Sequence, residues 1–113
     1  MEREPDRRRH SRIQTRLVVF VKYANGKVER ALTQDIGGMG ACLVTSQPLA
    51  PGTVIGVEIK LPDREALVAG TATVVWSRQL PDGKGRAETG ITFTSIDPKE
   101  LAILQQYVKL NSV

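Results

Sequence analysis

Two adjacent residues, Asn25 and Gly26, constrain the fold more than any other pair in the sequence. Both tolerate a positive φ, which a type I′ turn between two antiparallel strands requires, so they predict a β-hairpin. Residues 17–23 precede the turn and are rich in the β-branched and aromatic residues that suit a pleated, half-buried surface. The return strand is expected from Lys27 to about Asp35, and it brings Asp35 back towards the residues before the first strand.

The next part of the chain continues with short strands. Residues 55–61 alternate apolar and polar side chains with a period of two, which predicts one buried and one exposed face. Other strands are expected at residues 41–45, 67–76 and 87–94, with Gly70 at a bulge or bend. Gly37, Gly38 and Gly40 make a strand difficult to sustain between the second and third strands.

A helix is predicted at about residues 97–110. Asp97 is a suitable N-cap, Pro98 suits the first helical position, and Glu100 completes a capping box. A hydrophobic staple between Ile96 and Leu101 is expected at the same end. The apolar stripe at helical spacing consists of Leu101, Leu104 and Val108, widened by Ile103 and Tyr107. Six short strands and one terminal amphipathic helix predict an all-β domain, a small antiparallel barrel that the helix plugs or flanks.

Charge divides the 113-residue chain into a basic arm (residues 1–12) and a nearly neutral domain (residues 13–113). Residues 1–16 hold six of the Arg residues against Glu2, Glu4 and Asp6, so +3 of the net charge of +4 lies there. The arm has almost no apolar residue to bury, so it is expected to be flexible until a ligand or the barrel holds it. The charge favours an anionic partner.

The arm contains four guanidinium groups in six residues, from Arg7, Arg8, Arg9 and Arg12. Such groups bind phosphate and the O6/N7 edge of guanine in a bidentate manner. A segment that starts with the carboxylate of Asp35 and continues with glycines ends at Gly40. An ionised carboxylate can accept hydrogen bonds from guanine N1–H and N2–H₂. The alternatives are a non-specific basic tail, a turn Asp that caps local amides, and a plain turn glycine.

These two segments together resemble the PilZ domain family, bacterial receptors for cyclic di-GMP. The family pattern is R-x-x-x-R, a strand hairpin, and then D/N-x-S-x-x-G. Arg8 and Arg12 match the first motif, Asp35 and Gly40 match the second, and Gly37 stands where the family usually has Ser. The resemblance continues through residues 89–93 and the final helix. It implies a six-stranded antiparallel β-barrel with a C-terminal helix.

The resemblance also implies a ligand site for cyclic di-GMP, bound as one molecule or as a stacked pair. Arg7 directly precedes the R-x-x-x-R motif, a position that accompanies binding of two ligand molecules in the family; the alternative is one more solvated charge. Gly37 removes one hydrogen bond, which weakens the site by about 0.5–1.5 kcal/mol. Trp76 and Arg78 are further candidates beside a bound base, although a single Trp more often packs in a core or rim. The expected site residues are Arg7, Arg8, Arg9, Arg12, Asp35, Gly37, Gly40, Trp76 and Arg78.

No catalytic constellation is visible in the sequence, and the single His10 has no partner for a metal, so neither an enzyme nor a cofactor is expected. The single Cys42 excludes an internal disulfide and is expected to be a small buried residue in a reducing compartment. No signal peptide or membrane-spanning run is present, which favours the bacterial cytoplasm without membrane insertion.

The sequence therefore predicts a cyclic di-GMP receptor that changes conformation and signals to an unidentified protein partner, in motility, exopolysaccharide or biofilm control. The alternative is a ligand-blind interaction module of the kind that acts in pilus assembly, which typically lacks the arginine motif. A nucleic-acid binder is not expected, because aromatic residues make up only 4% of the chain.

Overall fold

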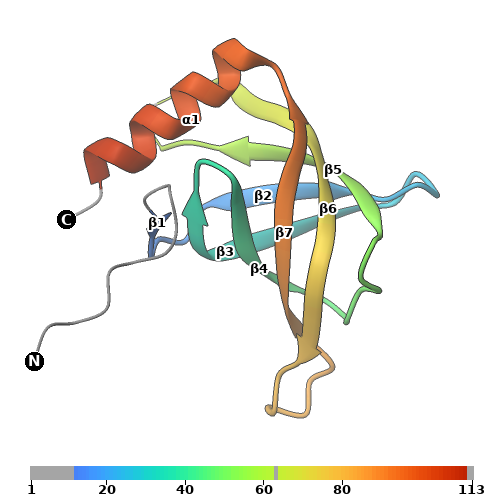
Figure 1. The fold of residues 1–113 in the computed structure, drawn as a ribbon. Coiled ribbons are helices and arrows are strands. Elements are labelled where there is room, and N and C mark those ends of the chain that lie inside the picture. Colours follow the sequence, from blue (N-terminus) through green and yellow to red (C-terminus); the bar gives the residue numbers. More distant parts are fainter. Residues whose placement is uncertain (1–11, 63, 112–113) are drawn as a thin grey trace, which may run out of the picture.

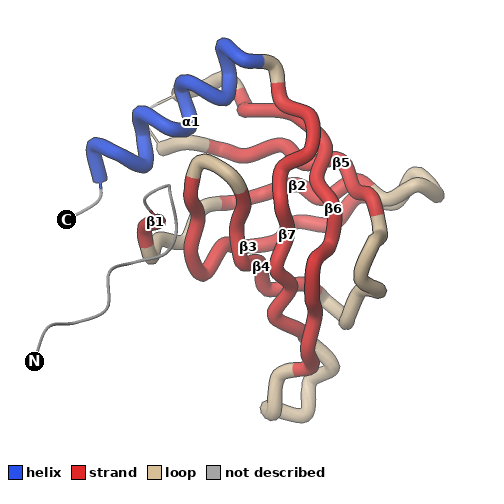
Figure 2. Tube along the Cα trace, in the orientation of Figure 1, coloured by secondary structure: helices blue, strands red, loops and turns tan. Residues whose placement is uncertain are grey.

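The structure, a computed structural model, describes residues 12–62 and 64–111, which form a β-barrel with one helix packed on it (Figures 1 and 2). The strands are β1 (Arg12–Ile13), β2 (Val18–Lys22), β3 (Val28–Gly37), β4 (Gly40–Thr45), β5 (Val54–Lys60), β6 (Leu67–Gln79) and β7 (Ala87–Ile96). The helix is α1 (Pro98–Asn111). This architecture confirms the predicted fold class, and the arm residues 1–11 lie outside the described residues.

The barrel closes through six antiparallel strands in the order β3-β2-β5-β6-β7-β4, with β4 paired back to β3. Closure leaves no free edge along the ring. The short β1 is an addition that the sequence did not predict, because two residues carry no periodic signal. It pairs Arg12 with Gly37 and Ile13 with Ile36. β1 thus includes Arg12, the last residue of the expected arm.

The core lies inside the barrel and beneath α1. Along β5, the residues Ile55, Val57 and Ile59 are each about 1% exposed, which confirms the predicted period of two. Leu104 and Val108 of α1 are also buried and belong to the same apolar cluster. Apolar burial on this scale is the main stabilising contribution to a domain of this size.

The hairpin between β2 and β3 forms where it was predicted, but the type I′ turn is wrong. Gly26 has φ +89°, whereas Asn25 does not have a positive φ. Gly26 N–H donates to Tyr23 C=O (2.9 Å) and Tyr23 N–H donates to Lys27 C=O (2.8 Å), which gives a three-residue loop with a glycine bulge. The Asn25 side chain instead accepts a hydrogen bond from Lys27 N–H (2.9 Å).

Helix α1 begins as predicted at Asp97, whose Oδ1 accepts a hydrogen bond from Lys99 N–H (2.8 Å). The expected capping box is wrong, because Glu100 Oε1 accepts from Ala69 N–H of β6 (2.8 Å) and ties the helix to the barrel. Leu101 is only half-buried and lies outside the core cluster. No helix in the described part of the chain has the length and hydropathy of a membrane span.

Candidate functional site

A β-bulge in β3 turns two neighbouring side chains outward. The pairing of β3 with β4 shifts between Thr33 and Asp35, so Gln34 is an extra residue. Thr33 and Ile36 are buried, at 1% and 0% exposure, while Gln34 is exposed and Asp35 half-exposed. Strict alternation from Thr33 would have pointed Asp35 into the core. The bulge therefore makes its carboxylate available at the surface.

A second bulge in β6 does the same for Trp76. The pairing of β6 with β7 shifts between Val74 and Trp76, which leaves Val75 as the extra residue. Val74 is 1% exposed, whereas Val75 and Trp76 are 55% and 42% exposed. Neither bulge was predicted from the sequence. Trp76 is thus not a core residue.

The two bulges face one cleft of about 410 Å³ on the outer side of the barrel. The strands β3, β4, β7 and β6 lie next to one another in the sheet, and each contributes to the lining. The lining residues are Arg12, Gln34, Asp35, Ala41, Cys42, Val75, Trp76, Arg78, Glu88, Gly90 and Ile91. The central strand β4 supplies two small residues, Ala41 and Cys42, over which a flat group can approach the sheet closely.

Arg12 and Asp35 form one wall of the cleft. Arg12 Nε donates to Asp35 Oδ1 (3.1 Å), and Nη2 of the same guanidinium forms an ion pair with that oxygen. Both side chains remain partly accessible, at 24% and 32% exposure. This contact confirms that the hairpin returns Asp35 to the residues before the first strand, 23 positions earlier.

Trp76, Arg78 and Glu88 form the opposite wall. Arg78 Cζ lies 5.8 Å from the centre of the Trp76 ring, within the range of a cation–π interaction. Arg78 Nε also donates to Glu88 Oε1 (2.8 Å). The indole lies directly over Gly90, where a Cβ would come within 2.3 Å of Trp76 Nε1. Glycine at this position is therefore what allows the ring to lie against β7.

Cys42 is buried between the two walls, as predicted. Its Sγ donates to Gln34 Oε1 at 3.5 Å, so the thiol also orients a side chain of the β3 bulge. Burial is the main reason that the pKa of the Cys42 thiol is raised, and the charges of Asp35 and Glu88 raise it further. The thiol therefore stays protonated at neutral pH and can act as a donor.

The described part of the cleft is electrically balanced. Two guanidinium groups, of Arg12 and Arg78, face two carboxylates, of Asp35 and Glu88, and each forms an ion pair. An anionic ligand would have to compete with these carboxylates or bring further cations to the cleft. The expected site residues Arg7, Arg8 and Arg9 lie outside the described residues.

Gly37 and Gly40 do not line the cleft. Gly37 lies in β3 directly opposite Arg12, and neither glycine has a positive φ. A Cβ at Gly40 would come within 2.3 Å of Ile91 C=O on β7. The structural reason for glycine at position 40 is thus the close approach of β4 and β7, which the sequence reading did not consider.

Seven lining residues were not among the expected site residues, namely Gln34, Ala41, Cys42, Val75, Glu88, Gly90 and Ile91. Gly90 lies within the segment of residues 89–93 that carried part of the resemblance, which was the available signal. Nothing in the sequence places Glu88 opposite Arg78. No group of three His, Cys, Asp or Glu side chains suited to a metal occurs in residues 12–62 and 64–111.

The described chain is thus an all-β domain, a closed barrel whose surface cleft holds an arginine–aspartate pair and an exposed indole. The chain belongs to the PilZ domain family, whose model matches residues 6–110. PilZ domains are receptor and binding domains rather than enzymes. A comparison with curated protein sequences gave no match.

Solved structures show the same fold at low sequence identity. The inhibitor of motility MotI/DgrA from Bacillus subtilis matches with a TM-score of 0.79 and 21% identity, over 94% of this chain and 51% of its own. The PilZ domain of Escherichia coli YcgR, solved with c-di-GMP, matches with a TM-score of 0.71 and 20% identity, over 93% and 91%. The MrkH–c-di-GMP complex from K. pneumonia matches with a TM-score of 0.75 and 16% identity, over 93% and 52%. This chain thus spans about half of MotI/DgrA and of MrkH.

Proposed function

We propose that this protein is a receptor for cyclic di-GMP, which binds in the cleft between the Arg12–Asp35 pair and Trp76. The observation that carries the proposal is the presence of a guanidinium, a carboxylate and an exposed indole around a floor of small residues. Cyclic di-GMP presents the complementary groups, namely phosphates, guanine edges and flat bases. The two relatives solved with c-di-GMP, YcgR and MrkH, support the choice of ligand.

Each wall has a distinct role in this proposal. Asp35 accepts hydrogen bonds from a guanine edge, while Arg12 either binds phosphate or lies over a base. Trp76 provides a stacking surface, and a stacked base contributes about 1–3 kcal/mol. Because the cleft is electrically balanced without ligand, Arg7, Arg8 and Arg9 supply the charge that one or two ligand molecules require.

Ligand binding brings the arm onto the barrel and changes the surface that a protein partner meets, an order–disorder mode of switching. The name of MotI/DgrA, an inhibitor of motility, supports control of motility as one output. Exopolysaccharide synthesis and biofilm formation are further outputs that we propose from the family resemblance, in the bacterial cytoplasm. No catalytic role is proposed.

Calorimetric titration with cyclic di-GMP tests the proposal, with GTP as the comparison ligand. Arg12→Ala is expected to weaken binding by at least about tenfold, because charge-assisted contacts contribute about 1.5–3 kcal/mol each. Arg30→Ala is the matched control: Arg30 is an exposed arginine on β3 that does not line the cleft. Its removal is expected to change the affinity less than about twofold.

Two results would contradict the proposal. Equal losses for Arg12→Ala and Arg30→Ala would reduce the arginines to a non-specific basic surface. The absence of binding by the unaltered protein would favour the ligand-blind interaction module, for which the replacement of the usual Ser by Gly37 is the supporting observation. Since Gly37 has no positive φ, a Ser at this position is compatible with the backbone conformation.

A further inference from the structure

A second cleft, of about 490 Å³, lies beside the first and is lined by four cationic side chains. They are Arg16, Arg30, Lys84 and Arg86. Gln34 lines both clefts, so the two adjoin on β3. All four cations are exposed, and none of them belongs to the proposed ligand site. We name this surface the basic cleft.

The basic cleft has a net positive charge, because its lining holds four cations and a single carboxylate, that of Glu29. The one acidic residue in the lining, Glu29, has both carboxylate oxygens engaged: Oε1 accepts from Tyr23 OH (2.7 Å) and Oε2 accepts from Ser46 N–H (2.6 Å). The guanidinium groups of Arg16 and Arg30 make no hydrogen bond or ion pair with another described residue. Arg86 alone pairs with an outside carboxylate, Asp82, at 2.6 Å.

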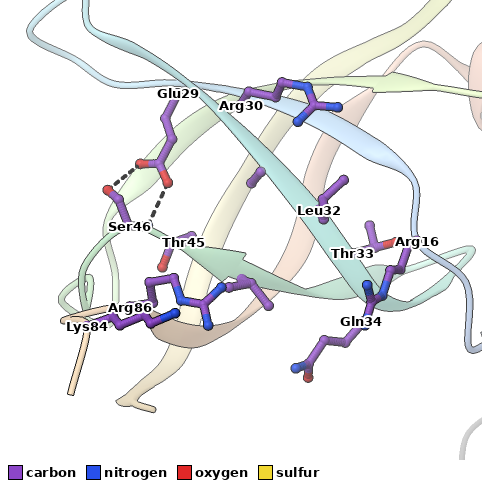
Figure 3. A pocket seen from close by; sticks show the side chains of 12 residues that line it. Arg16, Glu29, Arg30, Leu32, Thr33, Gln34, Thr45, Ser46, Lys84 and Arg86 are labelled. Carbon is purple, nitrogen blue, oxygen red and sulfur yellow. Dashed lines mark hydrogen bonds between the residues drawn. The ribbon is translucent and has the colours of Figure 1, made fainter. Parts of the chain in front are cut away.

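The four cations are spread along the cleft rather than focused on one point. Figure 3 shows Arg16 beside Thr33 at one end, with Lys84 and Arg86 beside Thr45 at the other. The lining of β3 runs from Glu29 to Gln34, a length of about 17 Å at the usual rise of a strand. Such a distribution suits an extended anion better than a single phosphate group.

The uncharged lining distinguishes between extended anions. Leu32 and Val44 provide partly exposed apolar surface, and no aromatic side chain lines the basic cleft. Single-stranded nucleic acids bind largely by stacking bases on aromatic rings, which are absent from this lining. A polypeptide that alternates acidic and apolar residues matches both the charges and the apolar surface.

We propose that the basic cleft is the docking surface for an extended acidic segment of the protein partner. The proposal rests on the proposed function only in assigning this partner a role in signalling, since the cleft and its charges do not depend on cyclic di-GMP. Its position beside the ligand cleft, with Gln34 common to both, places the partner where a bound ligand and an ordered arm would meet it.

The test uses the full chain and a peptide of about eight residues in which Glu alternates with Val, long enough to span the cleft. NMR titration is expected to shift the backbone amides of Arg16, Leu32 and Ser46 and to leave the Trp76 indole unchanged. Arg16→Gln and Arg30→Gln are each expected to weaken the peptide affinity by about twofold to fivefold, as for exposed ion pairs, and their effects are expected to add in the double variant. Lys27→Gln, an exposed cation outside the cleft, is the matched control.

Three results would overturn the proposal. They are equal binding of a peptide in which Gln replaces Glu, unchanged affinity in the Arg16→Gln/Arg30→Gln double variant, and tighter binding of a single-stranded oligonucleotide or of inorganic phosphate than of the peptide. Titration of the double variant with cyclic di-GMP separates the two sites. Loss of peptide binding with retained cyclic di-GMP binding in the double variant would support the basic cleft as the docking surface. Failure of the parent protein to bind cyclic di-GMP would contradict only the proposed ligand site.

Discussion

At the scale of single residues, Trp76 and Gly90 depend on each other. The indole occupies the space that any side chain at position 90 would need. The wall of the cleft depends on both residues, because the exposed ring can lie against β7 only where that strand has no side chain. The β6 bulge supplies the remaining condition, since it turns Trp76 outward next to Val75.

Gly90→Ala is expected to displace the indole, since the new Cβ would lie 2.3 Å from Trp76 Nε1. Trp76 is the single Trp of the chain, so its fluorescence reports the change directly, and a red shift is expected as the ring moves into water. Affinity for cyclic di-GMP should fall by about tenfold with the loss of stacking. Gly56→Ala is the control, because its nearest contact is the Lys22 side chain at 3.3 Å. An unchanged spectrum in Gly90→Ala would contradict this account.

Cys42 gives a prediction in pH. Its raised pKa keeps the thiol protonated in the folded protein at a pH where an exposed thiol is already partly ionised. The reaction with a thiol reagent at pH 8 is therefore expected to be slower for the folded protein than for the protein unfolded in urea. As the pH rises from the pKa of an ordinary thiol through the raised pKa of Cys42, the free energy of unfolding is expected to fall, because only the unfolded protein readily releases this proton. Equal rates for folded and unfolded protein would show that Cys42 is accessible and unperturbed.

At the scale of elements, Gly40 of β4 leaves no room for a side chain against β7. Gly40 faces the backbone of Ile91, where no side chain can move aside. Gly38, two residues earlier, faces the flexible side chain of Gln105 instead. The two glycines of this short connection thus have different structural roles, although they look alike in the sequence.

Gly40→Ala is expected to destabilise the barrel by about 1–3 kcal/mol, the usual range for overpacking against a backbone that must shift. Gly38→Ala should cost less, because Gln105 can adopt another rotamer. Urea denaturation of both variants checks the difference. A smaller effect for Gly40→Ala than for Gly38→Ala would mean that β4 and β7 can separate without cost.

At the scale of the whole molecule, α1, the last element of the described chain, contacts β1, the first element. It contacts β1 and β3, which hold Arg12 and Asp35, and it also contacts β6, which holds Trp76. Leu104 is 0% exposed within the core cluster, whereas Leu101 of the predicted stripe is only half-buried. The helix thus packs against the strands that carry Arg12 and Asp35, and a hydrogen bond from Ala69 N–H to Glu100 joins it to β6.

Leu104→Ala is expected to lower the free energy of unfolding by about 2–5 kcal/mol, the range for a large-to-small change in a core. Leu101→Ala is expected to cost clearly less, because part of its side chain is already in water. Thermal unfolding of the two variants provides the measurement. Equal losses would show that α1 packs on the barrel through a different face.

Much of this fold could be predicted from sequence because its signals are local. The period of two in β5, the glycine after Asn25 and the cap at Asp97 each act within a few residues. The resemblance in Arg8, Arg12, Asp35 and Gly40 then indicated the family, which the match over residues 6–110 established. The predicted capping box is wrong because Glu100 instead accepts a hydrogen bond from the backbone N–H of Ala69, which is distant in sequence.

The tertiary structure decided which side chains share a surface. Bulges arise from the pairing of two strands, so no single strand reveals that Asp35 and Trp76 point outward. The same holds for Gly90 beneath the indole and for the cations of the basic cleft, which come from three separate segments. Periodicity along one segment encodes which face is buried, but contacts between segments depend on register and closure, and these exist only once the barrel has formed.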